Sequence, residues 1–375
     1  MKYFLAQEAV LKWLETPCVY HINNDELYEL DRDSFEFLKD CSESGCSSQK
    51  SEFIDYCLKE GILTKKRVPI KRPFLIKPPD PSLRYLELQI TDKCNLTCRH
   101  CYIEDRGRNE LSEAQVRITL NEFEQMQGLR ILITGGEPLL HSRFEVINEM
   151  LPQFFIRKVL FTNGLLLDEE RIKNLNVDEI QISIDGLEDA HDSLRGKGTF
   201  RLAMKAINLS LDHGFHVSIA TMVHPGNLGG FDEMERLFKD MGIKDWTVDV
   251  PCVTGRLQEN TEFQIRPYEG GRYLRYGYGG GLHTGASGFA CGLHLMAVMA
   301  DGKVAKCTFY SDSAVGRVEE GLKVCWQRIK PVRLDELKCD CEYIESCRGG
   351  CRYRAELFGD PLGKDLDRCA LHGII

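Results

Sequence analysis

Residues 83 to 250 alternate apolar strands with helical segments, and this repetition constrains the fold more than any other feature of the sequence. The expected strands are YLELQI (85–90), RILITG (130–135), KVLFTN (158–163), EIQISID (179–185), HVSIAT (216–221) and WTVDV (246–250). Six strand–helix units of this length form a parallel sheet that curls into a barrel or part of one. We therefore predict an α/β fold built on a partial (β/α)6 barrel of the TIM type, with its functional residues at the carboxyl ends of the strands.

The clearest helix of this central part spans residues 112–127. Ser112 and Gln115 have the spacing of a capping box, and Leu111 and Val116 have that of a hydrophobic staple. The sequence therefore marks where this helix begins.

Two smaller parts flank the barrel. In residues 1–75, CVYHI (18–22) and LYEL (27–30) predict a β-hairpin, and two helices follow, the first capped by Asp33 and the second ending at Gly61. A hairpin with helices indicates a small winged-helix-like module. The proline-rich, basic segment 65–81 reads as a linker to the barrel.

Residues 251–375 form the third part, which is rich in glycine and cysteine and has weak periodicity. GYGGG (277–281) and RGGC (348–351) interrupt regular structure. Such a region has little apolar area for a core of its own, so we expect bound metal to organise it.

Composition excludes several classes of function. The 375-residue chain carries a formal net charge of −9 and has no long basic run, so we expect no nucleic-acid partner. It has no apolar run of about eighteen residues, the minimum for a membrane span. The N-terminal MKYFLAQEAVLKWLE lacks the pattern of a secretory signal. We therefore expect a cytoplasmic protein without a membrane partner.

The sixteen cysteines are unevenly distributed. Three lie within eight residues at Cys94, Cys98 and Cys101, many of the others lie between Cys291 and Cys369, and none occurs from residue 102 to residue 251. In a cytoplasmic chain of this size, clustered cysteines indicate metal binding or redox chemistry.

The first cysteine cluster, CNLTCRHC (94–101), directly follows the first barrel strand and so belongs at the functional end of the barrel. Three thiolates can ligate three irons of a [4Fe–4S] cluster and leave the fourth iron open. An open coordination position is where a metal performs chemistry. The alternatives are a zinc site that lacks one ligand and three unrelated loop thiols.

This spacing, followed by Tyr102, resembles the motif of the radical S-adenosylmethionine (SAM) superfamily. The second strand then ends in Gly135-Gly136-Glu137-Pro138, which matches the GGEP element of that family. The resemblance implies an enzyme whose open cluster binds SAM and cleaves it reductively to a 5′-deoxyadenosyl radical. That radical abstracts a substrate hydrogen.

The same resemblance assigns SAM contacts. The two glycines let the backbone approach the methionyl amino group, and Glu137 adds a hydrogen bond to it. Thr162 and Asn163 end the third strand. Further contacts follow by similarity: Ser183 and Arg195 to the carboxylate or ribose, and His100 near the adenine. The alternatives are a helix cap for Ser183, a surface charge for Arg195, and a turn or an acid–base role for Asp185.

The C-terminal cysteines resemble a SPASM domain, which ordinarily carries two auxiliary [4Fe–4S] clusters. By this resemblance one distal cluster and one nearer cluster bring the total to three. The distal ligands are Cys339, Cys341, Cys347 and Cys369. The nearer ligands are Cys291, Cys307 and Cys351. The sequence departs from the family pattern twice: one residue rather than two separates Cys339 from Cys341, and HTGASGFA (283–290) lacks a further cysteine. Disulfides or zinc are the alternative reading of this part.

The nearer cluster therefore has an open iron, or it is closed by Cys252, Cys325, His283 or His294. Cys252 follows the sixth strand and also fits a hydrogen-atom donor or an inert thiol. In the first part, Cys57 lies on an apolar helix face, and Cys41 and Cys46 either bind metal or have no special role.

The N-terminal part (1–75) resembles the recognition element fused to enzymes that modify ribosomally made peptides. Such an element binds a leader peptide as an added strand, and the alternative is a packing module without a ligand. We hypothesise a peptide maturase that installs a thioether, a carbon–carbon crosslink or an epimer, with a flavodoxin or ferredoxin as electron donor. The competing hypotheses are an enzyme acting on a tetrapyrrole precursor, one oxidising a protein side chain, and a non-catalytic iron–sulfur protein.

Overall fold

The computed structural model describes residues 2–47, 51–103, 107–279, 281, 283, 288–290 and 292–375. Six parallel strands form its centre, in the spatial order β12-β11-β10-β9-β8-β7. They are β7 (Tyr85–Thr91), β8 (Arg130–Gly135), β9 (Arg157–Thr162), β10 (Glu179–Ser183), β11 (His216–Met222) and β12 (Asp245–Asp249). All six predicted strands are confirmed. Within the described residues β12 does not pair back onto the other end of the sheet, so the barrel is partial.

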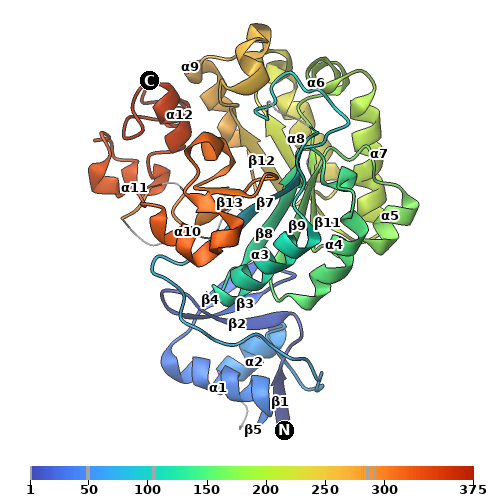
Figure 1. The fold of residues 1–375 in the computed structure, drawn as a ribbon, viewed down its shortest axis with the longest axis vertical. Helices are drawn as coiled ribbons and strands as arrows, with labels where there is room; N and C mark the ends of the chain where they lie inside the picture. Colours follow the sequence, from blue (N-terminus) through green and yellow to red (C-terminus); the bar gives the residue numbers. More distant parts are fainter. Residues whose placement is uncertain are drawn as a thin grey trace.

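Helices cover the outer face of this curved sheet (Figure 1). They are α3 (Glu113–Gln125), α4 (Phe144–Met150), α5 (Glu169–Asn174), α6 (Glu188–Arg195), α7 (Thr199–Asp212) and α8 (Phe231–Asp240). Helix α3 begins as predicted, because the Ser112 side chain accepts from the Gln115 backbone N–H while Gln115 reaches back to the N–H of Ser112. The cap fixes the first turn of the helix and the direction in which the chain enters it.

Side chains along each strand point alternately to the outer face, which packs against the helices, and to the barrel interior. Leu86, Leu88 and Ile90 of β7 pack outward against the helices, as do Ile180 and Ile182 of β10. The residues between them are polar and face the barrel interior. This apolar outer face stabilises the fold by about 1.5–3 kcal/mol for each fully buried large side chain.

Two small sheets and two helices make up the N-terminal module (residues 1–75). One sheet contains β1 (Lys2–Leu5), β5 (Cys46–Ser47) and β6 (Leu63–Thr64). The other contains β2 (Ala9–Trp13), β3 (Pro17–His21) and β4 (Glu26–Glu29). The helices are α1 (Arg32–Glu43) and α2 (Glu52–Lys59). The predicted hairpin is confirmed as β3–β4, which pairs Cys18 with Glu29.

Three details of this module differ from expectation. The cap of α1 is Asp31 rather than Asp33, because Asp31 is extended and accepts from the Ser34 N–H at 2.8 Å, whereas Asp33 already lies in the first helical turn. Strands β1 and β2 were not anticipated. Cys41 and Cys46 are joined by a disulfide.

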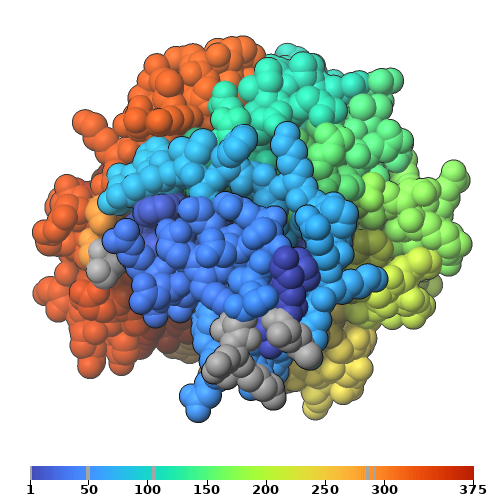
Figure 2. All heavy atoms as spheres, turned by 90° about the horizontal axis from the view of Figure 1, so that it is seen from below, coloured from blue at the N-terminus to red at the C-terminus, as the bar shows by residue number. Residues whose placement is uncertain are grey.

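The module is docked on the amino-terminal end of the barrel, the end opposite the cysteine loop (Figure 1), and its residues cover much of the face seen in Figure 2. The fully buried Arg157 of β9 donates to the carbonyls of Ile22 and Asn23 in the β3–β4 turn at 2.8 and 2.9 Å. Lys12 of β2 is also buried and donates to the carbonyls of Gly128 and Phe155. These contacts fix the module to the barrel through polar groups that water does not reach.

The C-terminal part extends the same sheet. Strand β13 (Leu295–Val298) pairs in parallel with β7, and β14 (Lys303–Ala305) and β15 (Gly316–Arg317) follow in antiparallel order. Short helices complete this part: α9 (Pro267–Gly270), α10 (Leu322–Arg328), α11 (Ile344–Cys347), α12 (Arg352–Leu357) and α13 (Leu366–Leu371). The sequence indicated short elements here but not a strand joining the barrel. Within the described residues, every helix is too short or too polar to span a membrane.

Candidate active site

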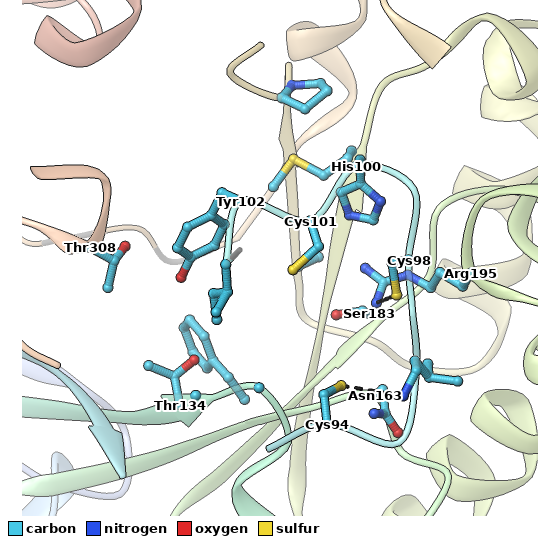
Figure 3. Close-up of a pocket in the computed structure, with 18 of the residues that line it drawn as sticks. Cys94, Cys98, His100, Cys101, Tyr102, Thr134, Asn163, Ser183, Arg195 and Thr308 are labelled. Atoms are coloured by element: carbon cyan, nitrogen blue, oxygen red, sulfur yellow. Dashed lines mark hydrogen bonds between the residues drawn. The ribbon is translucent and has the colours of Figure 1, made fainter. Parts of the chain in front are cut away.

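A cavity of about 310 Å³ opens at the carboxyl ends of the barrel strands (Figure 3). Its walls bring together the cysteine loop after β7, the ends of β8 to β12, and a loop that follows β14. The lining residues that the sequence singled out are Cys94, Cys98, His100, Cys101, Tyr102, Gly135, Gly136, Thr162, Asn163, Ser183, Asp185, Arg195 and Cys252. The structure thus gathers most of the proposed site residues around one space.

The three cysteines of the loop all face this cavity. Cys98 is buried, and Cys94 and Cys101 are half-buried. The Cys94 sulfur accepts from the backbone N–H of Leu96 at 3.4 Å, and the Arg195 guanidinium lies 4.0 Å from the Cys98 sulfur. Three thiols around one cavity, with donors and a positive charge beside them, fit the ligands of a cluster that has three protein ligands.

Gly135 and Gly136 hold this loop in place. The Gly136 N–H donates to the Thr91 carbonyl at 2.9 Å, and the Glu137 N–H donates to the Lys93 carbonyl at 2.7 Å. A Cβ on Gly135 would lie 2.2 Å from the Thr91 oxygen, and one on Gly136 would lie 2.3 Å from the Lys93 oxygen. Only glycine permits this close approach of the two backbones, so both residues help to position the cysteine loop at the cavity.

Glu137 is placed differently from the expected contact with the SAM amino group. Its side chain is fully buried and does not line the cavity. The carboxylate accepts from the Thr162 hydroxyl at 2.8 Å and from the backbone N–H groups of Asn163 and Leu139 at 2.9 and 3.2 Å. Burial raises its pKa to about 7, against the effect of these donors. Glu137 therefore ties the end of β8 to the end of β9, and Pro138 begins a short helix beside it.

Arg195 is neither exposed nor solvated. Its Nε lies 2.5 Å from Asp185 Oδ2, and the other Asp185 oxygen accepts from the Met222 N–H at 2.7 Å. Burial alone would raise the pKa of Asp185, but the Arg195 charge brings it well below its usual range. Asp185 therefore orients Arg195, and both of its carboxylate oxygens are held by donors. Ser183, on the same strand, lines the cavity next to them.

His100 lies against this pair. Its Nε2 is 3.9 Å from Asp185 Oδ2, and its buried Nδ1 has no hydrogen-bond partner among the described residues. Burial lowers the pKa of His100 to about 4, so the ring is neutral at pH 7. The site thus offers a neutral imidazole at the cavity wall.

Asn163 and Tyr102 mark two opposite sides of the cavity. Asn163 donates to the Asn95 side chain at 2.8 Å and so connects the end of β9 to the cysteine loop. The Tyr102 hydroxyl accepts from Gln89 at 3.2 Å, and its ring packs against Phe309 with centroids 5.0 Å apart. Figure 3 shows Tyr102 standing between Cys101 and Thr308.

The sequence reasoning missed part of the lining, above all Glu87, Thr134, Phe161, Gln181, Thr308 and Phe309. The Glu87 carboxylate accepts from the Thr308 N–H at 3.0 Å, and burial raises its pKa. A signal was present for Glu87 and Gln181, because each is a polar residue within an apolar strand, where alternation turns it inward. No local signal marks Thr308 and Phe309, which lie more than 200 residues from β7.

Charge effects connect the cysteines assigned to the distal cluster. Burial raises the pKa of Cys369 to about 11, and the thiols of Cys339 and Cys347 lie close enough to raise it further. Cys341 acts in the same way on Cys339 and on Cys347. The coordination of a four-iron cluster by these four thiols stays a prediction.

Of the cysteines assigned to the nearer cluster, Cys307 and Cys351 are described and Cys291 lies outside the described residues. Nowhere in the described ranges do three or more His, Cys, Asp or Glu side chains converge as ligands of a single ion would. Thiolates of a four-iron cluster each bind a different iron and need not converge in this way.

Comparison with known proteins agrees with this geometry. Residues 88–241 match the family model described as "Radical SAM superfamily". The chain is 28% identical over 192 residues to an AdoMet-dependent heme synthase of Oleidesulfovibrio alaskensis, a match that covers 49% of this chain and 50% of that protein. It is 28% identical over 327 residues to the mycofactocin maturase MftC of Mycolicibacterium smegmatis, covering 76% of this chain and 82% of that protein.

Among solved structures, SuiB of Streptococcus suis bound to the precursor peptide SuiA superposes with a TM-score of 0.68. The match covers 97% of this chain and 99% of SuiB at 14% identity, so it bears on the fold alone. The chain spans about half the length of the heme synthases that it matches.

Proposed function

Because residues 88–241 form a domain of the radical SAM superfamily, we propose that this chain cleaves SAM reductively and abstracts a hydrogen atom from a ribosomally made precursor peptide. The outcome is a thioether, a carbon–carbon crosslink or an epimer. The observation that carries this proposal is the convergence of Cys94, Cys98 and Cys101 on the cavity at the carboxyl ends of the strands. Residues 1–75 are the peptide-recognition module, 83–250 the radical SAM barrel and 251–375 the auxiliary-cluster domain.

The side chains around the cavity have distinct tasks in this proposal. When bound, the [4Fe–4S] cluster and SAM supply the 5′-deoxyadenosyl radical. Arg195, oriented by Asp185, offers its guanidinium to the SAM carboxylate or ribose, and Ser183 offers a hydroxyl. The remaining SAM contacts are Gly135, Gly136, Thr162, Asn163, His100 and Tyr102. The enclosing walls exclude water and hold the reacting groups in place.

The peptide is proposed to enter from the side of Tyr102, Thr308 and Glu87. Tyr102 and Thr308 line the part of the cavity that faces away from Arg195 and Ser183 (Figure 3), and Glu87 is hydrogen-bonded to Thr308. Burial raises the pKa of Glu87, and its carboxyl group accepts a hydrogen bond from the Thr308 N–H at 3.0 Å. A carboxyl group in this environment can meet a hydrogen-bond donor of the substrate.

Strand β4 offers the leader peptide an edge. It lies at one end of the three-stranded sheet β2-β3-β4, and its terminal residues Glu26 and Glu29 are exposed. An extended peptide can add to such an edge through backbone hydrogen bonds. The relatives MftC, named a maturase, and SuiB, solved with its precursor peptide, support this choice. A flavodoxin or ferredoxin in the cytoplasm would supply the electron.

Similarity to heme synthases favours a second candidate, an enzyme acting on a tetrapyrrole precursor. That similarity covers 49% of this chain, whereas the match to MftC covers 76%. A tetrapyrrole enzyme has no use for a leader-binding edge, so binding of a leader peptide by residues 1–75 separates the two candidates.

The first experiment tests SAM cleavage. The protein is reconstituted anaerobically with iron and sulfide, reduced with dithionite and given SAM, and 5′-deoxyadenosine is quantified. We expect production by the wild type, and a loss of at least a hundredfold in Cys98→Ala. Cys57→Ala, which changes a buried thiol of the N-terminal module, is the matched control and should retain activity. Equal production by Cys98→Ala and the wild type would overturn the assignment of the first cluster.

The second experiment tests the leader-binding edge with a precursor encoded by a short reading frame beside this gene. The Leu30 N–H donates to the Pro17 carbonyl, so by antiparallel alternation the N–H of Glu29 points away from β3. Glu29→Pro removes that outward donor, and Glu29→Ala keeps it. We expect about tenfold weaker leader binding for Glu29→Pro alone, with SAM cleavage unchanged. Equal leader affinities for the two variants would contradict strand addition at β4.

A further inference from the structure

The sequence offered four side chains that could supply the missing ligand of the nearer auxiliary cluster, and three of them form hydrogen bonds with other groups. His283 is bonded to the Tyr85 hydroxyl, His294 to the Ser82 carbonyl and Cys325 to the Arg317 carbonyl. His283 also donates to Asp25 in the β3–β4 turn, which places it at the opposite end of the barrel from the cysteine loop. The fourth candidate, Cys252, has a different environment.

Cys252 is buried, and the neighbouring thiol of Cys351, one of those assigned to the nearer cluster, raises its pKa. The two residues are 99 positions apart in the chain: Cys252 follows β12, and Cys351 immediately precedes α12. Cys252 also lines the main cavity. The pair of thiols therefore lies at the wall between the cavity and the C-terminal part.

A buried polar network enforces this pairing. Arg354, on the first turn of α12, donates to the Val250 carbonyl at 2.9 Å and to Asp249 at 2.5 Å. The same guanidinium binds Asp365 at 3.0 Å, and Asp365 accepts from the Cys351 backbone N–H at 2.6 Å. One side chain thus connects the strand end that leads to Cys252 with the backbone that carries Cys351.

Aromatic contacts bring Cys307 to the same junction. Phe309 and Tyr310, which follow Cys307, both pack on Tyr353, with ring centroids 5.2 and 5.3 Å away. Tyr353 is two residues beyond Cys351.

We infer that Cys252 is a ligand of the nearer auxiliary cluster, together with Cys307 and Cys351. This inference rests on the auxiliary clusters of the proposed function. Thiolates on different irons must stand farther apart than hydrogen-bond distance. A change of χ1 rotamer moves a cysteine sulfur by about 3 Å without moving the backbone, which is enough to separate Cys252 from Cys351.

Two consequences follow for the reaction. A cluster with four cysteine ligands has no open iron, so a substrate thiolate cannot bind to it directly. A ligated thiolate also carries no S–H hydrogen, so Cys252 cannot return a hydrogen atom to a substrate radical as epimerisation requires. The inference therefore favours crosslink formation over epimerisation among the three proposed outcomes.

The test uses the full chain in a Cys94→Ala/Cys98→Ala/Cys101→Ala background, which removes the first cluster and its open iron. The protein is reconstituted anaerobically and then oxidised mildly. Mild oxidation removes an iron that has no protein ligand. The three-iron cluster that remains has its own electron paramagnetic resonance signal. With Cys252 intact we expect about eight irons per chain and no three-iron signal. Cys252→Ala should show the signal and lose about one iron per chain. Cys252→Ser, which keeps the size of the side chain, guards against a packing effect, and Cys325→Ala is the matched control.

The outcomes are distinguishable. A background protein that holds no iron overturns both this inference and the auxiliary clusters of the proposed function. If the background protein keeps its iron and its spectrum does not change with Cys252→Ala, only the present inference is overturned. A three-iron signal already present with Cys252 intact also overturns it, because that cluster then lacks a fourth protein ligand.

Discussion

At the residue scale, the Arg195–Asp185 ion pair determines how the cavity presents charge. Both side chains are shielded from water, with 12% of the Arg195 side chain and none of the Asp185 side chain exposed. Arg195 also reaches towards the Cys98 sulfur. The Arg195 guanidinium keeps this position only while its counter-ion Asp185 holds it there.

We predict that Asp185→Asn weakens SAM binding about tenfold and lowers the free energy of unfolding by about 3 kcal/mol, because it leaves Arg195 buried without a counter-ion. Calorimetric titration with SAM and urea denaturation measure the two effects. Glu188→Gln is the control, since Glu188 pairs with Arg201 at the surface and should change stability by less than about 1 kcal/mol. An Asp185→Asn protein with wild-type SAM affinity would argue against a role for this pair in binding.

Two buried histidines make the protein sensitive to acid. Burial lowers the pKa of His191 and of His294 to about 4, from 6.5 in the unfolded chain. As the pH falls through this range the unfolded chain takes up a proton before the native protein does, so the stability present above pH 6.5 is lost between pH 6.5 and 4. Each histidine contributes a slope of up to about 1.4 kcal/mol per pH unit.

We predict that His294→Gln removes the contribution of one histidine to this slope of stability against pH. The glutamine amide can replace the hydrogen bond to the Ser82 carbonyl but does not titrate. Urea denaturation of the cluster-free protein at several values between pH 4.5 and 7 measures the slope. A variant whose stability falls with acid as steeply as that of the wild type would show that His294 titrates normally.

How much of the site the sequence revealed depends on where each residue lies. The cysteines, the glycine pair, Ser183 and Arg195 stand in local motifs and could be assigned from them. Asp185 was visible as a turn or acid–base residue, but its ion pair was not, since that pair depends on Arg195 packing back across the strand end. Thr308 and Phe309 reach the cavity through the β13–β7 pairing, and no local pattern reveals a contact so distant in the chain.

At the scale of elements, the cysteine loop and the β8 turn form a single unit. The backbone of residues 91–93 lies on Gly135 and Gly136, and the two segments exchange backbone hydrogen bonds. A loop held by backbone contacts keeps its shape independently of side-chain rotamers. The turn after β8 is therefore as important to the cluster site as the cysteines.

We predict that Gly136→Ala costs about 1–3 kcal/mol of stability and reduces iron in the first cluster, because the added Cβ meets two backbone oxygens that cannot move separately from the loop. Gly229→Ala is the matched control, since nothing lies within 4 Å of its added Cβ. Thermal denaturation and iron content report the two effects. A Gly136→Ala protein with normal iron content would mean that the loop tolerates displacement.

The elements that were predicted correctly are those with local signals. Strands β7 to β12 alternate with helices along the chain, and α3 has its cap in the sequence. Strand β13 is only four residues long and pairs with a strand more than 200 positions earlier, so its identity comes from the partner rather than from its own pattern. Strands β1 and β2, of four and five residues, are also short and were missed.

At the scale of the whole molecule, the N-terminal module is held by charges that water does not reach. Arg157 binds Glu179 within the barrel and two carbonyls of the module, and Arg130 forms an ion pair with Asp25 of the β3–β4 turn. Such groups are costly to bury unless every partner is present. The module and the barrel are therefore expected to unfold together.

We predict that Arg157→Met lowers the free energy of unfolding by about 3–5 kcal/mol and speeds proteolysis within residues 65–81, because Glu179 and the two carbonyls lose their donor. Arg201→Met, at a site where the side chain is 77% exposed, should change stability by less than about 0.5 kcal/mol. Urea denaturation and limited proteolysis measure these effects. Equal stability of the two variants would show that the module is held by its apolar contacts instead.

The parallel pairing of β13 with β7 bears on how such a protein can be assembled from parts. Strand β7 leads into the cysteine loop, and its other edge is occupied by β13, so the C-terminal region supplies one of the two neighbours of that strand. A chain cut after residue 250 would leave β7 as a bare apolar sheet edge, which invites aggregation. Exchange of this region between homologous enzymes should therefore succeed only when the junction lies beyond β13, so that the barrel keeps its own seventh strand.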